Sequence, residues 1–202
     1  MSSVKVTLPD GNVREYDAGV TLEEIAGSIS RSLQKAAVAG KIDGRLVDLY
    51  TPVHEDAQVE IVTLDQPEGL EVYRHTCTHV MAQAVKRLYP GTRLGVGPVI
   101  EDGFYYDMDI PVSLTPEDLE KIEAEMNKIV QENLPIRRHV VSREEAIRIY
   151  EQEGDPLKLE LIRDLPEEET ITIYEQGEFF DLCRGPHLPT TGKLTAFKLL
   201  SV

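Results

Sequence analysis

The 202-residue sequence has no tryptophan, only 6% aromatic residues and just two cysteines, Cys77 and Cys183. Two cysteines do not make a disulfide framework, so both are predicted to be reduced thiols of a cytoplasmic protein. No apolar run approaches the roughly 20 residues that span a bilayer, and the first residues lack the layout of a secretory signal. These absences exclude disulfide-rich secreted and membrane-spanning classes, and no membrane contact is expected. The remaining composition, 41% hydrophobic and 28% charged, is that of an ordinary globular protein.

Basic residues are scarce, with 21 lysines and arginines against 36 acidic residues and a net charge of −15. Proteins that grip nucleic-acid backbones usually present a basic face. The acidic excess is strongest in residues 151–181, where eleven carboxylates stand against Lys158 and Arg163 alone. This pattern predicts a solvated acidic face. If an RNA is the substrate, the chain is expected to bind it weakly. Other parts of a larger protein would then provide most of the RNA-binding affinity.

Residues 1–63 combine short strand patterns with one helix pattern. Residues 4–8 and 13–17 flank Pro-Asp-Gly-Asn, which predicts a hairpin with a tight turn. Thr21 and Glu24 form the capping-box pattern that begins a helix. Further strand candidates follow at 36–42, 46–49 and 58–63. The sequence therefore predicts a small mixed sheet wrapped around one helix.

Residues 64–69 (LDQPEG) are predicted to be a linker, and residues 70–202 a second region. A helix is expected over 70–88, where Pro90-Gly91 stops it, and further helices after the caps Thr115 and Ser142, the latter ending near Gly154. Strand candidates are a hairpin of 93–100 with 104–109, then 170–175, 178–182 and 195–202. The fold class is predicted to be α+β. The last strand candidate runs to the final residue, so the chain is expected to continue in a longer protein.

Two pairs of residues carry the chemistry. His75 and His79 lie four apart on a predicted helix, so both imidazoles project from one face. Cys183 and His187 are also four apart and follow a predicted strand, where Gly185-Pro186 excludes a regular helix. If this turn faces the helix, three histidines and one cysteine converge, a set that zinc accepts. Each pair alone arises often by chance, but the two together indicate a functional site.

Other features favour structural interpretations. Position 76 is threonine, so the helix lacks the glutamate of the zinc-peptidase pattern. Gly95-Val96-Gly97 is too short for a dinucleotide fingerprint, although glycines there would let a backbone approach a nucleotide closely. Cys77 lies on the opposite side of the helix and is expected in the core. His54 and His139 are expected to be surface or packing residues.

The combination of motifs resembles the editing domain of bacterial threonyl-tRNA synthetases. The motifs are HTCTH at 75–79, GPVI at 97–100 with GFYYD at 103–107, and DLCRGPH at 181–187. The two paired motifs are shared with the editing domain of alanyl-tRNA synthetases and its free-standing relatives. Residues 38–44 and 56–62 resemble the TGS domain, a ubiquitin-like β-grasp fold that precedes the editing domain in threonyl enzymes and not in alanyl ones. The resemblance covers essentially the whole chain.

The resemblance implies a TGS domain at 1–63, a linker at 64–69 and an editing, or second additional, domain at 70–202 with an antiparallel or mixed sheet packed by helices. The chain would stop before the aminoacylation core. The implied activity is proofreading, the hydrolysis of the ester of serine mischarged on threonine tRNA. A synthetic site alone cannot fully reject serine, because one missing methyl is worth only about 1–3 kcal/mol.

Site residues follow from the same resemblance. The implied catalytic residues are His75, His79, Lys158, Asp181, Cys183 and His187, and the implied substrate wall is Gly95, Val96, Gly97 and Tyr106. His75 and Lys158 would position or activate water, and Asp181 would hold the seryl amino group. Without the resemblance, Lys158 would be interpreted as a surface residue. No metal is expected to be required, although zinc is possible at His75, His79, Cys183 and His187. ATP and the zinc of the full-length enzyme would bind the absent catalytic core.

The expected partners are threonine tRNA, through its 3′-terminal seryl-adenosine, and the remainder of the synthetase chain. Three alternatives remain open from the residues: a free-standing trans-editing deacylase, a zinc-dependent hydrolase of another ester, and a non-enzymatic RNA-binding or regulatory module. The acidic balance weakens the last of these.

Overall fold

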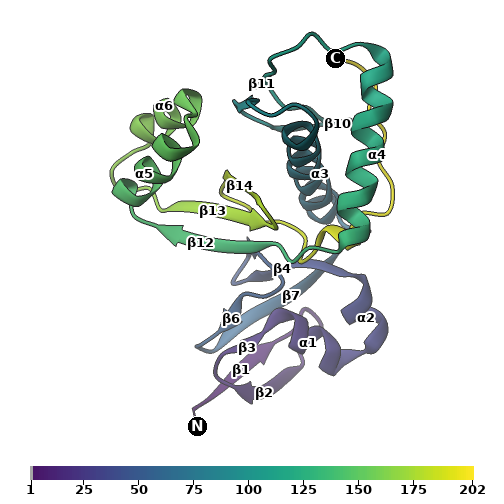
Figure 1. Cartoon of the computed structure of the whole chain (residues 1–202). Coiled ribbons are helices and arrows are strands. Elements are labelled where there is room, and N and C mark those ends of the chain that lie inside the picture. Colours follow the sequence, from purple (N-terminus) through teal and green to yellow (C-terminus); the bar gives the residue numbers. More distant parts are fainter. Residues whose placement is uncertain (1) are drawn as a thin grey trace. The chain divides into compact units, whose positions relative to one another are not determined.

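The structure is a computed structural model that describes residues 2–202 (Figure 1). The chain forms two compact units. The first comprises the residues up to Tyr73 together with Gly185–Pro189, and the second comprises Arg74–Arg184 with Thr190–Val202. Both units combine helices with strands, so the predicted α+β class is confirmed.

The first unit contains a five-stranded mixed sheet in the order β2-β1-β7-β4-β5. Its strands are β1 (Ser3–Thr7), β2 (Val13–Asp17), β4 (Ala37–Ile42), β5 (Arg45–Val47) and β7 (Ala57–Thr63). The neighbours β1 and β7 run parallel, and the other pairs are antiparallel. A separate two-stranded pair joins β3 (Val20–Thr21) to β6 (Pro52–Val53). The predicted hairpin of β1 and β2 is confirmed, with Gly11 at φ 83° in its turn.

Helix α1 (Leu22–Ile29) packs its apolar face into the core of the first unit. Both hydrogen bonds of the predicted Thr21–Glu24 capping box are present. Leu22, Ile25 and Ala26 are fully buried in one cluster with apolar side chains of β1 and β7. A second helix, α2 (Arg31–Ala36), shows that the prediction of a single helix was wrong. It has six residues and buries none of them, so it leaves no apolar stripe in the sequence.

The second unit contains an antiparallel sheet in the order β12-β13-β14 (Arg137–Val141, Ile171–Gln176 and Phe179–Leu182). Strand β12 was not predicted, because its side chains are mostly exposed and do not alternate. The predicted hairpin over 93–109 is present as two short pairs. They are β8 (Arg93–Leu94) with β11 (Met108–Asp109), and β9 (Val99–Ile100) with β10 (Gly103–Phe104).

Helix α3 (Pro67–Leu88) begins three residues before the predicted position. Residues 67–69 of the predicted linker therefore form its first turn, where proline is readily accepted. Gly69, the last residue of the predicted linker, is required for packing in this helix. A Cβ at this position would lie 2.0 Å from the carbonyl oxygen of Thr63.

Three further helices follow in the second unit: α4 (Pro116–Glu132), α5 (Arg143–Glu153) and α6 (Pro156–Asp164). The predicted caps Thr115 and Ser142 are confirmed as N-cap residues, and Gly154 ends α5 with φ 67°. Helix α6 was missed. Its signal was Asp155-Pro156, an N-cap followed by proline in the first turn.

The prediction of a strand at 195–202 was wrong, because this segment has no strand assignment and pairs with no strand among residues 2–202. It runs alongside α4 instead (Figure 1). The Glu123 carboxylate accepts from the Leu199 backbone N–H at 2.6 Å and from Lys198 Nζ at 2.8 Å. A glutamate side chain thus replaces the strand partner that an extended backbone needs. Among the helices described, none is both long and apolar enough to cross a bilayer.

Arg87, near the end of α3, connects three carboxylates within the second unit. Its guanidinium donates to both oxygens of Glu132, at 2.7 and 2.9 Å, and also to Glu178 and Glu125. The hydrogen bonds from Arg87 lower the pKa of Glu178 from about 4.5 to about 2, and they also lower the pKa of Glu132. These contacts join α3 to α4 and to the turn between β13 and β14.

Replacing Arg87 with methionine is expected to lower the free energy of unfolding at pH 7 by about 1 kcal/mol, because solvent screening limits half-exposed ion pairs. A depressed carboxyl pKa gives stability that is present above the ordinary value and is lost as pH falls. The difference from wild type should therefore disappear between pH 4.5 and about 2. Urea unfolding at several pH values measures this. Arg148→Met, at an exposed pair with Glu145, is the control and should show no such dependence.

Candidate functional site

Helix α3 carries His75 and His79 one turn apart on the same face, as predicted. Their rings lie 5.6 Å apart, edge to face. His75 is partly exposed, whereas His79 is buried and meets the ring of Phe179 on β14 at 5.7 Å. Burial lowers the pKa of His79 to about 3, against the opposing effect of Asp181. His79 is therefore neutral near pH 7.

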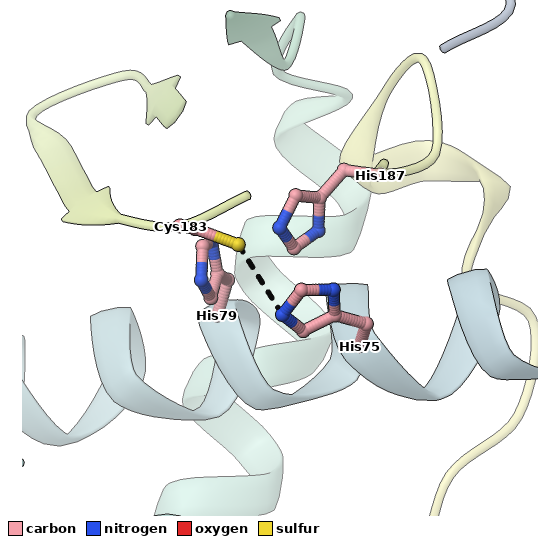
Figure 2. Close-up of side chains that lie close together, drawn as sticks. All are labelled: His75, His79, Cys183 and His187. Atoms are coloured by element: carbon pink, nitrogen blue, oxygen red, sulfur yellow. Dashed lines mark hydrogen bonds between the residues drawn. The ribbon is translucent and has the colours of Figure 1, made fainter. Parts of the chain in front are cut away.

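Cys183 directly follows β14, and its backbone is fixed by Thr172 on β13. The Thr172 hydroxyl donates to the Cys183 carbonyl, and the Cys183 N–H donates to the Thr172 carbonyl at 3.1 Å. The Cys183 sulfur lies 3.3 Å from Nε2 of His75 (Figure 2). Residues 183–187 form neither helix nor strand, as expected from Gly185-Pro186.

The ligand atoms of His75, His79 and Cys183, all in the second unit, lie within 4.8 Å of one another (Figure 2). This donor set is one that zinc accepts, so the cluster could bind the metal. Zinc bonds of about 2.0–2.3 Å in a tetrahedron would bring the donor atoms to roughly 3.3–3.8 Å from one another. Small side-chain movements would therefore accompany binding. Within the first unit, the His187 N–H donates to Asp48 at 2.9 Å.

Lys158 and Asp181 form an ion pair inside the second unit. The Nζ of Lys158 lies 2.7 Å from Oδ1 of Asp181, and both side chains are only 3% exposed. Lys158 comes from the first turn of α6 and Asp181 from β14. Lys158 is thus a buried residue, not the surface lysine that its local sequence suggested.

Tyr106 completes this buried group. Its hydroxyl donates to Oδ2 of Asp181 and accepts from Lys158 Nζ at 3.0 Å. Burial, and then the nearby Asp181 carboxylate, raise the pKa of Tyr106 far above its ordinary value, so the phenol remains a donor. The Nε2 of His79 lies 3.4 Å from the same carboxylate. Asp181 therefore connects Lys158, Tyr106 and His79.

Gly95, Val96 and Gly97 connect β8 to β9 and lie against the segment that carries Tyr106. The Gly95 N–H donates to the Asp107 carbonyl at 2.8 Å, and the Asp107 N–H donates to the Val96 carbonyl at 2.9 Å. A Cβ on Gly97 would lie 2.4 Å from the Tyr106 ring. The absence of that side chain lets the tyrosine ring pack on the backbone. Val96 is exposed.

A cavity of about 180 Å³ lies beside Cys183 in the second unit. Its lining is mainly apolar, with Leu161 of α6, Leu165 directly after that helix and Ile171 of β13. Arg184, which also lines it, pairs with Glu169 at 3.0 Å. The cavity leaves space for a small chemical group next to Cys183.

The remaining candidates have structural positions. Cys77 is buried, and burial raises the pKa of its thiol to about 12, in agreement with the predicted core position. His54 and His139 are exposed, and His139 lies 3.7 Å from Glu175. Sequence reasoning missed Asp155, a buried carboxylate at the start of α6. Its N-cap pattern could have identified the helix but not its contact with β8.

Comparison with known proteins supports the resemblance noted from the motifs. Residues 4–63 match the TGS domain model, and residues 171–202 match the model of the threonyl and alanyl tRNA synthetase second additional domain. The chain is similar to threonine–tRNA ligases from Anoxybacillus flavithermus (63% identical over 199 residues), Geobacillus kaustophilus (63%) and Bacillus subtilis (ligase 1, 57%). These matches cover 98% of this chain.

The same matches cover only 31%, 30% and 31% of the three ligases. The chain thus spans about a third of the length of the curated relatives it matches. The two domain models match at opposite ends of the chain, in the order expected from the motifs. The chain corresponds to the amino-terminal region of the threonyl-tRNA synthetase family, a TGS domain followed by the editing domain.

Proposed function

We propose that this chain hydrolyses the ester of serine mischarged on threonine tRNA. In this reaction, water attacks the ester carbonyl carbon and the bond from that carbon to the ribose oxygen breaks. The products are free serine and a tRNA with a free terminal hydroxyl. The observation that carries the proposal is the buried Lys158–Asp181 ion pair, joined by Tyr106 and lying against the histidine helix through His79.

Lys158 is proposed to supply positive charge for the oxyanion that develops on the ester carbonyl. An ammonium held in a buried site stabilises such charge more strongly than it would in water. His75, which is partly exposed and touches Cys183, is proposed to orient or deprotonate the attacking water. His79 is neutral and buried, which suits a role in holding Asp181 rather than in exchanging protons with solvent.

Asp181 is proposed to hold the Lys158 side chain in place. Both of its oxygens already have partners, since Oδ1 pairs with Lys158 and Oδ2 accepts from Tyr106. This arrangement favours the role of a fixed counter-charge over that of a binding group for the seryl amine. Gly95, Val96 and Gly97 are proposed to form the wall that receives the terminal adenosine and the seryl group.

The wider organisation is part of the same proposal. We assign residues 1–63 to the TGS domain, 64–69 to a connection that overlaps the first turn of α3, and 70–202 to the editing domain. Threonine tRNA and the rest of a cytoplasmic synthetase chain are the proposed partners. The net charge of −15 argues for weak RNA affinity of this region alone.

A zinc-dependent hydrolase of another ester is the second candidate, because the donor atoms of His75, His79 and Cys183 lie close together in the second unit. If bound, zinc would polarise a carbonyl or activate water. His75, His79, Cys183 and His187 would hold it. Stoichiometric zinc in the purified chain, together with loss of hydrolysis on chelation, would favour this candidate over the metal-independent reaction.

The test of the proposed function compares two esters on the same tRNA. The chain is expected to release serine from threonine tRNA at least about tenfold faster than threonine, because an extra methyl in a closely fitting pocket costs about 1–3 kcal/mol. Release of radiolabelled amino acid measures both rates. Equal hydrolysis of the two esters would refute proofreading, and no hydrolysis of either would refute the enzymatic assignment.

A further inference from the structure

We propose that Asp155 is a positioning residue for the reaction. Its side chain would hold α6, the helix that carries Lys158, against β8, the strand that directly precedes Gly95. This inference rests on the proposed function for its consequence, but its structural basis is independent of that function. All of the contacts lie within the second unit.

The Asp155 side chain makes two different connections with its two carboxylate oxygens. Oδ1 accepts from the backbone N–H groups of Leu157 and Lys158, at 3.1 and 3.3 Å, and so caps α6. Oδ2 accepts from the backbone N–H of Leu94 on β8 at 3.0 Å. An N-cap requires only the first connection, and serine or asparagine makes it equally well. The second connection has no role in capping.

The Asp155 backbone is also fixed. Its N–H donates to the Tyr150 carbonyl in the last turn of α5, and its carbonyl accepts from Leu159 of α6. Asp155 is the single residue between Gly154, which ends α5, and Pro156, which begins α6. A buried carboxylate held in this way leaves little freedom in the direction of α6.

The two elements that Asp155 joins also meet at the site. Leu94 pairs with Met108 across β8 and β11, and the next contacts along these strands hold Asp107, the neighbour of Tyr106. The Tyr106 hydroxyl then accepts from Lys158 Nζ at 3.0 Å. The start of α6 is thus connected to this part of the chain twice, by the hydrogen bond of Asp155 with Leu94 and by that of Lys158 with Tyr106.

These two connections explain what the hydrogen bond between Asp155 and Leu94 does. The lysine side chain is long and flexible, so its Nζ position depends on where the helix begins. A shift of about 1 Å in a catalytic group can reduce a rate by up to about a hundredfold. Asp155 fixes the separation of the two backbones and thereby the distance from Nζ to the tyrosine oxygen.

Asp155→Asn separates the two connections. Asparagine keeps an oxygen that can cap α6, but its amide NH₂ cannot accept from the Leu94 N–H. In hydrolysis of serine esterified to threonine tRNA, kcat of the 202-residue chain is expected to fall about tenfold, the effect of one lost buried hydrogen bond, with KM changed less than about twofold. Ser142→Ala removes the cap of α5 and is the matched control. It should lower the thermal midpoint without changing kcat.

A double-mutant cycle with Tyr106→Phe distinguishes positioning from general destabilisation. If Asp155 acts through the Lys158–Tyr106 contact, Asp155→Asn should change kcat by less than about twofold once the tyrosine hydroxyl is absent. Equal losses in both backgrounds, or an unchanged kcat in the single variant, would overturn the proposal.

Amide hydrogen exchange supplies a readout that does not depend on activity. Asp155→Asn is expected to speed exchange at Leu94 at least about tenfold, because its N–H loses a buried acceptor. Ser142→Ala should leave this amide unchanged. If the wild type does not hydrolyse the seryl ester, the proposed function fails and exchange alone decides the inference. Unchanged protection of Leu94 in Asp155→Asn would then overturn it.

Discussion

Replacing Lys158 with methionine is expected to lower seryl-ester hydrolysis by about 10²–10⁴-fold and to destabilise the chain by about 3–5 kcal/mol. Both effects have one cause. Methionine fills a similar volume but leaves the Asp181 carboxylate, 3% exposed, without its positive partner. Single-turnover hydrolysis measures the first effect and urea unfolding the second.

A second substitution separates stability from chemistry. Combining Lys158→Met with Asp181→Asn removes the uncompensated charge, so most of the lost stability should return. Hydrolysis should stay low, because the ammonium group is still absent. Lys121→Met removes the exposed partner of Asp118 and serves as the control. Recovery of activity together with stability in the double variant would show that Lys158 has only a structural role.

Replacing Gly97 with alanine is expected to reduce hydrolysis by up to about a hundredfold, with KM and kcat both affected. The new Cβ would lie 2.4 Å from one carbon of the Tyr106 ring and 2.8 Å from the next, so the ring must move. Its hydroxyl would then lose alignment with Lys158 and Asp181. Steady-state kinetics on the seryl ester measures the loss.

Gly103→Ala is the matched control for this prediction. Gly103 lies on the same hairpin, and a Cβ there meets no atom within 4 Å. The control should keep hydrolysis within about twofold of wild type, since a small substitution that meets no neighbour rarely changes stability by more than about 0.5 kcal/mol. Normal activity of Gly97→Ala would mean that the ring position, and with it the Tyr106 contact, does not matter for the reaction.

Local features were predictable from the sequence, because they depend on residues a few positions apart. The caps at Thr21, Thr115 and Ser142 satisfy backbone groups within one helical turn, and the structure has each of them. The common face of His75 and His79 follows from helix geometry alone. The class α+β followed from summing such local patterns.

Predictions of secondary structure failed where the local sequence has no hydrophobic pattern or has one that indicates a different element. Helix α2 buries no side chain and β12 is mostly exposed, so neither has the hydrophobic periodicity that identifies an element. The apolar segment 195–202 looked like a strand, but α4 presents Glu123 to it in place of a strand edge. Gly69 was assigned to the predicted linker, yet it lies in α3, where the nearby Thr63 carbonyl requires glycine.

The sequence by itself determined the capped starts of α1, α4 and α5, the hairpins and the two residue pairs with metal-ligand spacing. The tertiary structure alone decided that His75 and Cys183, 108 residues apart, come within 3.3 Å. It also decided that Lys158 is buried against Asp181 and that one carboxylate of Asp155 serves two elements. The reason is physical. Helix and turn signals reflect bonding within a few residues, whereas a buried charge is determined by which distant segments surround it.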